Sequence, residues 1–192
     1  MTVNLEELKK KAENCKKCDL WKNRKNIVFG EGLENAKIMI IGLGPGYYEN
    51  LYGKPFVGAA GKFLNKLLEI VNLKREKIYI TNIVKCYLPN NKVTEIQIKT
   101  CALNYLDKQI ALINPKIIFA LGNIAVNYLF NKFKLLIKPM KDIHGKVFKI
   151  SSLLVIPMYH PASALRNPNL KEILIEDWKN CKHYVIRALE DC

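Results

Sequence analysis

The stretch KIMIIGLGPG, Lys37 to Gly46, joins a run of apolar residues to a loop rich in glycine. The run at 37–42 is short, continuous and ends in glycine, which is typical of a strand buried on both faces of a parallel sheet. The loop at 42–46 reads G-x-G-x-G with Pro45, so it is not the G-x-G-x-x-G fingerprint of dinucleotide-binding proteins. A glycine-rich loop still lets backbone N–H groups approach a ligand closely. The stretch therefore predicts a core strand followed by a ligand-binding loop or a plain tight turn.

The alternation of strand and helix extends along the chain on both sides of this stretch. Short apolar runs predict further strands at 77–86, 116–122, 146–150 and 153–158. The spacing of apolar residues predicts helices at 4–13, 59–71, 94–113, 123–130 and 169–190. Strands that alternate with helices indicate a parallel sheet covered on both faces. Ligands of such sheets bind beyond the carboxyl ends of the strands.

Composition limits the kind of protein that the chain can be. With 192 residues and 49% hydrophobic content, we expect one domain over residues 1–192. No apolar run reaches the ~18 residues that span a bilayer, and no signal peptide is recognisable, so we expect a cytoplasmic protein without membrane contact. Lysine and arginine number 31 against 17 acidic residues, a net charge of +14. This charge favours a polyanionic partner such as nucleic acid, with a lysine-rich solvated surface as the alternative.

Four of the six cysteines are spaced as ligands of one metal site. Cys15 and Cys18 form a C-x2-C pair, Cys86 follows the second predicted strand, and Cys101 lies on the next predicted helix. Zinc ribbons usually repeat the C-x2-C pair, whereas iron–sulfur sites tolerate irregular spacing. Spacing alone leaves zinc and an iron–sulfur cluster equally open, together with a redox-active or incidental C-x2-C pair.

Three further side chains fall where a ligand of the predicted sheet would bind. Phe56 precedes a helix, Asn82 ends a strand, and His160 follows another strand. The Phe56 ring could pack in the core or form a platform for a planar base. A buried Asn82 amide needs hydrogen-bond partners, and at a fixed angle it can distinguish uracil from cytosine. Each residue alone is usually structural, but the glycine-rich loop at 42–46, Asn82 and His160 converge at one edge of the predicted sheet, and this convergence indicates a site.

Four motifs carry a resemblance to a known family. They are GKPFVGAAGKFLNKLL, YITNIVKC, PKIIFALG and YHPASALRNP. From Cys15 to about Trp178 the chain resembles the family 4 uracil-DNA glycosylases, the iron–sulfur branch of that superfamily. The resemblance implies a three-layer α/β/α sandwich around a four-stranded parallel sheet. It also implies a [4Fe–4S] cluster on the four cysteines named above, and DNA containing uracil as the partner.

The resemblance also assigns roles by position. Phe56 would stack on an extruded uracil, and Asn82 would bond the N3–H and O4 edge of the base. His160 would face O2, where negative charge collects as the glycosidic bond breaks, so Asn82 and His160 are the expected catalytic residues. Glu49 would crowd out the methyl group of thymine, with Tyr48 as a second candidate.

Two further segments have expected contacts with the substrate. The loop that would surround the base consists of Gly42, Leu43, Gly44, Pro45 and Gly46. Leu165 and Arg166 correspond to the segment that wedges into the duplex and holds phosphates.

One residue departs from the family pattern. The family usually reads G-E-[AQ]-P-G at the first loop, and its glutamate is associated with orienting the attacking water. Leu43 stands at that position, as in the family 5 enzymes, whose loop reads G-L-A-P-A and whose substrate range is broader. We therefore expect a monomeric, monofunctional uracil-DNA glycosylase. A broader deaminated-base glycosylase, a non-catalytic iron–sulfur DNA-binding protein and a zinc-stabilised nucleic-acid module stay open as alternatives.

Overall fold

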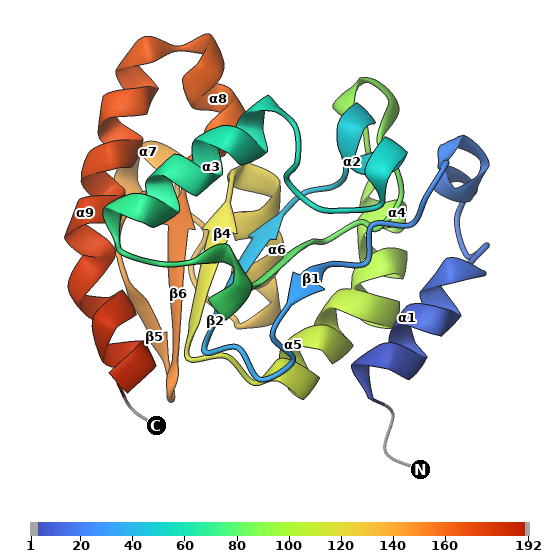
Figure 1. Cartoon of the computed structure of the whole chain (residues 1–192), viewed down its shortest axis with the longest axis horizontal. Helices are drawn as coiled ribbons and strands as arrows, with labels where there is room; N and C mark the ends of the chain where they lie inside the picture. Colours follow the sequence, from blue (N-terminus) through green and yellow to red (C-terminus); the bar gives the residue numbers. More distant parts are fainter. Residues whose placement is uncertain (1–3, 191–192) are drawn as a thin grey trace.

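A mixed sheet of six strands forms the centre of the computed structural model, which describes residues 4–190 (Figure 1). The strand order is β1-β3-β2-β4-β6-β5. The strands are β1 Glu31–Gly32, β2 Ile38–Gly42, β3 Tyr79–Asn82, β4 Ile117–Leu121, β5 Phe148–Ile150 and β6 Leu153–Met158. The four inner strands run parallel, while β1 and β5 pair antiparallel at the two edges. The predicted four-stranded parallel sheet is thus present, with one short strand added on each side.

The inner strands are apolar throughout because both of their faces are buried. Along β2, Ile38 and Ile40 pack into one layer of the core, and Met39 and Ile41 pack into the other. Successive side chains of a strand point to opposite faces, so a strand between two helical layers has no position for a solvated side chain. This is the physical reason why the continuous run after Lys37 predicted the centre of the fold.

Helices cover both faces and give the predicted α/β/α sandwich (Figure 1). One face carries α3 Ala59–Ile70, α8 Pro161–Arg166 and α9 Pro168–Glu190. On this face the rings of Phe119 and Trp178 stack with centroids 4.6 Å apart. The other face carries α1 Leu5–Glu13, α4 Glu95–Cys101, α5 Asp107–Ile113 and α6 Asn123–Lys132. Within residues 4–190, no helix combines the length and apolar character needed to cross a membrane.

The structure corrects several boundaries of the sequence prediction. The helix predicted at 94–113 consists of α4 and α5 joined by a π-helical turn at Ala102–Leu106. The strand predicted at 77–86 is limited to β3, although backbone hydrogen bonds from Ile83 to Gly42 and from Val84 to Leu43 continue beyond it. The segments α2 Tyr47–Tyr52, α7 Met140–Ile143 and α8, and the strand β1, are too short for a periodic pattern to predict.

Three single-turn 3-10 helices, at Asp19–Asn23, Arg75–Lys77 and Pro89–Asn91, complete the described elements. The carboxyl ends of β2, β3, β4 and β6 meet at one edge of the sheet, at the top of Figure 1. The short helices α2 and α8 lie at this same edge, on either side of it. The elements that sequence patterns miss are therefore concentrated where the fold places ligands.

Gly61 in α3 is required by the close approach of the chain around Phe56. A Cβ atom at this position would lie 1.8 Å from the Phe56 carbonyl oxygen. We expect Gly61→Ala to lower the free energy of unfolding by about 1–3 kcal/mol or more, because the backbone at 56 has to move away. Urea denaturation measures the change. Lys62→Ala, at an exposed position of the same helix, is the control and should change stability by less than about 0.5 kcal/mol.

Candidate functional site

A cavity of about 140 Å³ lies at the carboxyl ends of the parallel strands. It is far smaller than the ~300–1,000 Å³ of sites for drug-sized ligands, so it suits a single small ring. Its walls come from five separate segments of the chain. The lining residues are Gly44, Gly46, Glu49, Phe56, Ala60, Asn82, Asn91, His160 and Ala162. The fold thus brings Phe56, Asn82, His160 and Glu49 together, as the sequence analysis expected.

His160 presents a defined hydrogen-bond donor to this cavity. Its Nδ1 accepts a hydrogen bond from the backbone N–H of Ala162 at 3.1 Å, and it caps the start of α8 in this way. Because Nδ1 is an acceptor, a neutral ring carries its proton on Nε2. Burial, assisted by the charge of Arg166, lowers the pKa of His160 to about 4. At pH 7 the side chain is therefore a neutral imidazole with an Nε2–H group.

Asn82 and Phe56 are packed against each other over Gly42. Asn82 is 2% exposed and Phe56 is 6% exposed. A Cβ at position 42 would lie 2.5 Å from Asn82 Oδ1 and 2.8 Å from Phe56 Cζ. The glycine that ends β2 therefore serves to let both side chains reach the strand end. The Phe56 ring also stacks on His160, with centroids 5.7 Å apart.

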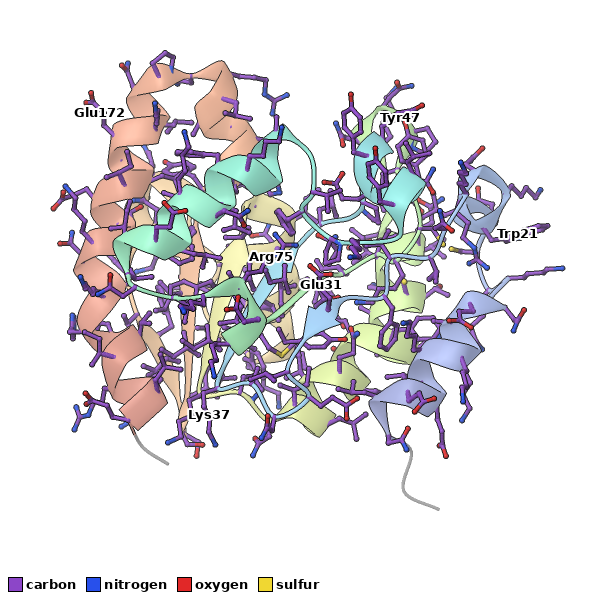
Figure 2. The ribbon with its side chains drawn as sticks, in the orientation of Figure 1. Trp21, Glu31, Lys37, Tyr47, Arg75 and Glu172 are labelled. Atoms are coloured by element: carbon purple, nitrogen blue, oxygen red, sulfur yellow. The ribbon has the colours of Figure 1, made fainter. Side chains whose placement is uncertain are left out.

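Arg75 forms hydrogen bonds with the backbone of the segment before α3. Its Nη1 donates to the Phe56 carbonyl at 3.0 Å, and its Nη2 donates to the Pro55 carbonyl. The guanidinium also pairs with Glu31 at 2.9 Å (Figure 2). Phe56 has a φ of 51°, which is uncommon for a bulky residue and needs support from its surroundings. Arg75 and Gly61 supply that support.

Glu49 and Tyr48, the two candidates beside the base, point in different directions. Glu49 lines the cavity, and its Oε1 accepts from the backbone N–H groups of Val57 and Gly58 at 2.9 and 2.8 Å. These donors belong to the start of α3, where the helix leaves N–H groups without an intrahelical partner. Tyr48 is absent from the cavity wall and is 54% exposed. Of the two, the structure places only Glu49 in the cavity.

The remaining predicted contacts divide between the cavity and its surroundings. Gly44 and Gly46 line the cavity, whereas Gly42 and Pro45 lie buried behind it. The Leu43 side chain packs against an apolar cluster of the core rather than the cavity.

Leu165 and Arg166 lie outside the cavity, at the end of α8. Leu165 is 52% exposed, and Arg166 is exposed as well. Both therefore lie on the surface, on the same short helix whose Ala162 lines the cavity.

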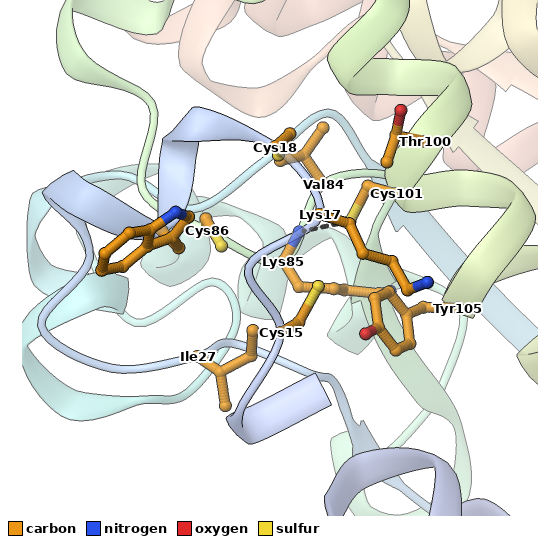
Figure 3. Close-up of a pocket in the computed structure, with 11 residues that line it drawn as sticks. Cys15, Lys17, Cys18, Ile27, Val84, Lys85, Cys86, Thr100, Cys101 and Tyr105 are labelled. Atoms are coloured by element: carbon orange, nitrogen blue, oxygen red, sulfur yellow. Dashed lines mark hydrogen bonds between the residues drawn. The ribbon is translucent and has the colours of Figure 1, made fainter. Parts of the chain in front are cut away.

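The four predicted ligand cysteines line a second cavity, shown in Figure 3. Cys15 and Cys18 come from the segment after α1, Cys86 from the loop after β3, and Cys101 from the end of α4. Burial raises the pKa of the Cys101 thiol to about 12 and also raises those of Cys18 and Cys86. Burial therefore favours the neutral thiol at these positions. Over residues 4–190, no three His, Cys, Asp or Glu side chains are gathered closely enough to hold a metal ion.

Arg24 and Lys85 donate hydrogen bonds to sulfur atoms of these cysteines. Arg24 donates to the carbonyl oxygens of Cys15 and Glu13, and its Nη1 lies 3.4 Å from Cys86 Sγ. The backbone N–H of Lys85 donates to Cys101 Sγ at 3.3 Å (Figure 3). N–H donors of this kind stabilise sulfur atoms that carry negative charge.

The Lys85 side chain connects the two cavities. It is completely buried, and its Nζ donates to Thr81 Oγ1, the Asn82 carbonyl and Gln109 Oε1, each at 2.6 Å. Three acceptors match the three hydrogens of an ammonium group. Burial lowers the pKa of Lys85 to about 7. The same residue thus contacts Cys101 through its backbone and Asn82 through its side chain.

Sequence reasoning missed Asn91, Arg75, Arg24 and the contacts of Lys85. Asn91 lines the base-sized cavity from a 3-10 turn with a φ of 56°, a conformation that favours asparagine. In the sequence, the two asparagines after Pro89 were the feature that could have predicted this turn. No periodic pattern indicates a single arginine that contacts carbonyl oxygens distant in sequence.

Fold and site together define an α/β/α domain with a pocket for one small ring beside a four-thiol site. The family profile described as "Uracil DNA glycosylase superfamily" matches residues 29–186. The chain is 44% identical to the type-4 uracil-DNA glycosylase of Sulfurisphaera tokodaii over 188 residues, which cover 95% of this chain and 86% of the relative. The chain belongs to the uracil DNA glycosylase superfamily, in its type-4 branch.

Two further relatives agree with this placement. The type-4 uracil-DNA glycosylase of Saccharolobus solfataricus is 44% identical over 185 residues, which cover 93% of this chain and 85% of the relative. That of Archaeoglobus fulgidus is 40% identical over 181 residues, which cover 92% and 90%. The similarity therefore extends over nearly the whole of each chain.

We expect Lys85→Met to destabilise the fold by about 1–3 kcal/mol. The change leaves three buried acceptors without their donor, and part of that cost is offset because a charge is no longer buried. Urea denaturation of both proteins checks the value. Lys66→Met, at an exposed position of α3, is the matched control. A Lys85→Met variant as stable as this control would show that the network contributes nothing to stability.

Proposed function

We propose that this protein removes uracil from DNA by hydrolysing the N-glycosidic bond, which leaves an abasic site for base-excision repair. The observation that carries the proposal is the convergence of Phe56, Asn82 and His160 on one base-sized cavity. It is supported by full-length similarity to type-4 uracil-DNA glycosylases. We further propose that residues 1–192 act as one domain and a monomer, in the reducing environment of the cytoplasm.

Binding would begin with extrusion of the nucleotide, because a base inside a duplex cannot reach the cavity. Extrusion costs roughly a few kcal/mol. Attraction between the net charge of +14 and the DNA phosphates would offset the free-energy cost of extrusion. Leu165, exposed at the end of α8, would fill the gap left in the stack, and the neighbouring Arg166 would hold a phosphate.

Recognition would rest on the buried amide of Asn82 and on Glu49. The amide oxygen would accept from N3–H of uracil while its NH2 group donates to O4, a pattern that cytosine reverses. Phe56, fixed by Arg75 and Gly61, would stack on the ring. Glu49, anchored at the start of α3, would stand where the methyl group of thymine has to fit.

Bond cleavage would depend on stabilising the negative charge of the departing uracil. The Nε2–H of neutral His160 would donate to O2 as charge develops there, and one such donor is typically worth ~3 kcal/mol. The sugar gains oxocarbenium character, water adds its hydroxyl group to C1′, and its proton ends on the uracil. No covalent bond to the protein is needed.

Leu43 gives specific support to a second version of this function. Its side chain packs into the core and brings no polar group to the cavity, where the family's usual glutamate would orient water. A site that does not orient the attacking water depends more on stabilising the negative charge of the departing base. Other deaminated bases also depart with negative charge, so the same site would act on them. A broader deaminated-base glycosylase, acting also on hypoxanthine, is therefore the alternative that we carry forward.

We also propose that Cys15, Cys18, Cys86 and Cys101 hold a [4Fe–4S] cluster. Support comes from the chemistry of the donors, because four thiols line one cavity and N–H groups of Arg24 and Lys85 lie within hydrogen-bond distance of two sulfur atoms. Over residues 4–190 the cysteines are not gathered closely enough to form a metal site, so binding a cluster would require them to move together. When bound, the cluster would link the segment after α1 to the loop after β3 and to α4. We assign it a structural role.

Single-turnover release of uracil from a synthetic oligonucleotide tests the proposed reaction. We expect the wild-type protein to form abasic sites and His160→Ala and Asn82→Ala to be slower by about 100-fold or more. An oligonucleotide with hypoxanthine, run in parallel, separates the strict from the broader enzyme. Salt-sensitive binding without any abasic product, even with enzyme in excess, would identify a non-catalytic DNA-binding protein. Unchanged rates in both variants would remove the site assignment.

Metal analysis of anaerobically purified protein tests the cluster. We expect visible absorption with about four iron and four sulfide ions per chain, and loss of both in Cys101→Ala. Cys181→Ala is the control, because Cys181 is buried in α9 and lines no part of the cysteine cavity. A colourless protein containing zinc would contradict the assignment.

A further inference from the structure

The short helix α2, which contributes Glu49 to the wall of the base-sized cavity, exposes three tyrosine rings. Tyr47, Tyr48 and Tyr52 are 63%, 54% and 62% exposed, and we call them the tyrosine face. The rings of Tyr47 and Tyr48 meet edge to face with centroids 5.5 Å apart, and Tyr48 lies beside Glu49 at Gly58. Figure 2 shows Tyr47 on the outer side of α2, away from the sheet. Large aromatic rings in this number are unusual on a solvated surface.

The helix that carries the tyrosine face is firmly attached to the rest of the protein. Asn50 is buried, and its Oδ1 accepts from the backbone N–H groups of Lys25 and Asn26 at 2.7 and 3.3 Å. Asn26 in turn donates to the carbonyl oxygens of Asn50 and Leu51. The helix ends at Gly53, which has a φ of 69°. The exposed rings therefore stand on a fixed support.

The charge around the face matches a nucleic-acid partner. Lys25, bonded to α2 through its backbone, and Lys54, just after it, are both exposed. Lysines that flank exposed aromatic rings are the pattern of single-strand-binding surfaces, where the charges follow the phosphates and the rings stack on bases. Across the cavity lies α8 with Leu165, so the two helices flank the opening: α2 contributes Glu49 and α8 contributes Ala162 to its wall.

We propose that the tyrosine face stacks on unpaired bases next to the extruded one, and so binds single-stranded DNA beside the active site. The proposal rests on the proposed function for its ligand, because it takes DNA as the polymer that enters the cavity. The cavity holds one small ring, so the neighbouring nucleotides have to lie on the surface around it. On the side of α2, the exposed rings of Tyr47, Tyr48 and Tyr52 form part of that surface.

Fluorescence anisotropy with a labelled single-stranded oligothymidine that contains no uracil tests this proposal. Changing all three tyrosines to alanine should weaken binding by about tenfold or more, because each stacked base contributes at that level. Changing all three to phenylalanine should keep binding within about twofold, since the rings remain. The slope of log K against log salt should be unchanged in both variants, because no phosphate contact is removed.

Leu136→Ala is the matched control, since this side chain is 73% exposed and lines neither cavity. A fully paired duplex should lose less than about threefold in affinity in the alanine variant. Binding of the alanine variant within twofold of the wild type would overturn the proposal. So would equal losses in the alanine and phenylalanine variants, which would indicate hydroxyl contacts, or an equal loss on duplex DNA. None of these measurements involves uracil release, so failure of the proposed reaction would be recognised separately.

Discussion

The buried Lys85 makes hydrogen bonds to the chain on the side of both cavities, through its amino group to Asn82 and through its backbone to Cys101. A charge without water costs several kcal/mol unless its surroundings replace the lost hydration. Thr81, Asn82 and Gln109 supply three acceptors at one distance, and this fixes how the chain leaves β3. Asn82 can then face the base-sized cavity while Cys86, four residues later, faces the other. A network of this kind tolerates one arrangement only, because each alternative leaves a buried polar group unpaired.

The sequence predicted the parts of this architecture that repeat or alternate. The apolar runs at Lys37 and Lys116 predicted central strands, because burial on both faces permits no polar residue there. The cysteine spacing predicted one shared metal site; the four residues line one cavity, but within residues 4–190 they are not gathered as a metal-binding group. Phe56 and His160 were found because each follows or precedes a regular element at the edge where ligands bind.

The remaining features depend on contacts between residues that are far apart in sequence. Arg75 donates to carbonyl oxygens almost twenty residues away, and Lys85 to Gln109 on a different layer. Neither contact has a periodic signal, and a lone lysine or arginine is usually read as a solvated charge. The short helices α2 and α8 are likewise not predicted by helical periodicity, which needs several turns to be recognised. Local sequence thus predicts the scaffold, while the supports of the pocket emerge only from tertiary packing.

The two strands at the edges of the sheet are very short. β1 spans two residues and β5 three, and each pairs antiparallel with a longer neighbour. Long open edges would invite sheets of neighbouring copies to join, and very short edge strands are one of the ways in which proteins prevent this. A second copy of this chain therefore meets little open backbone along which its own sheet could be added.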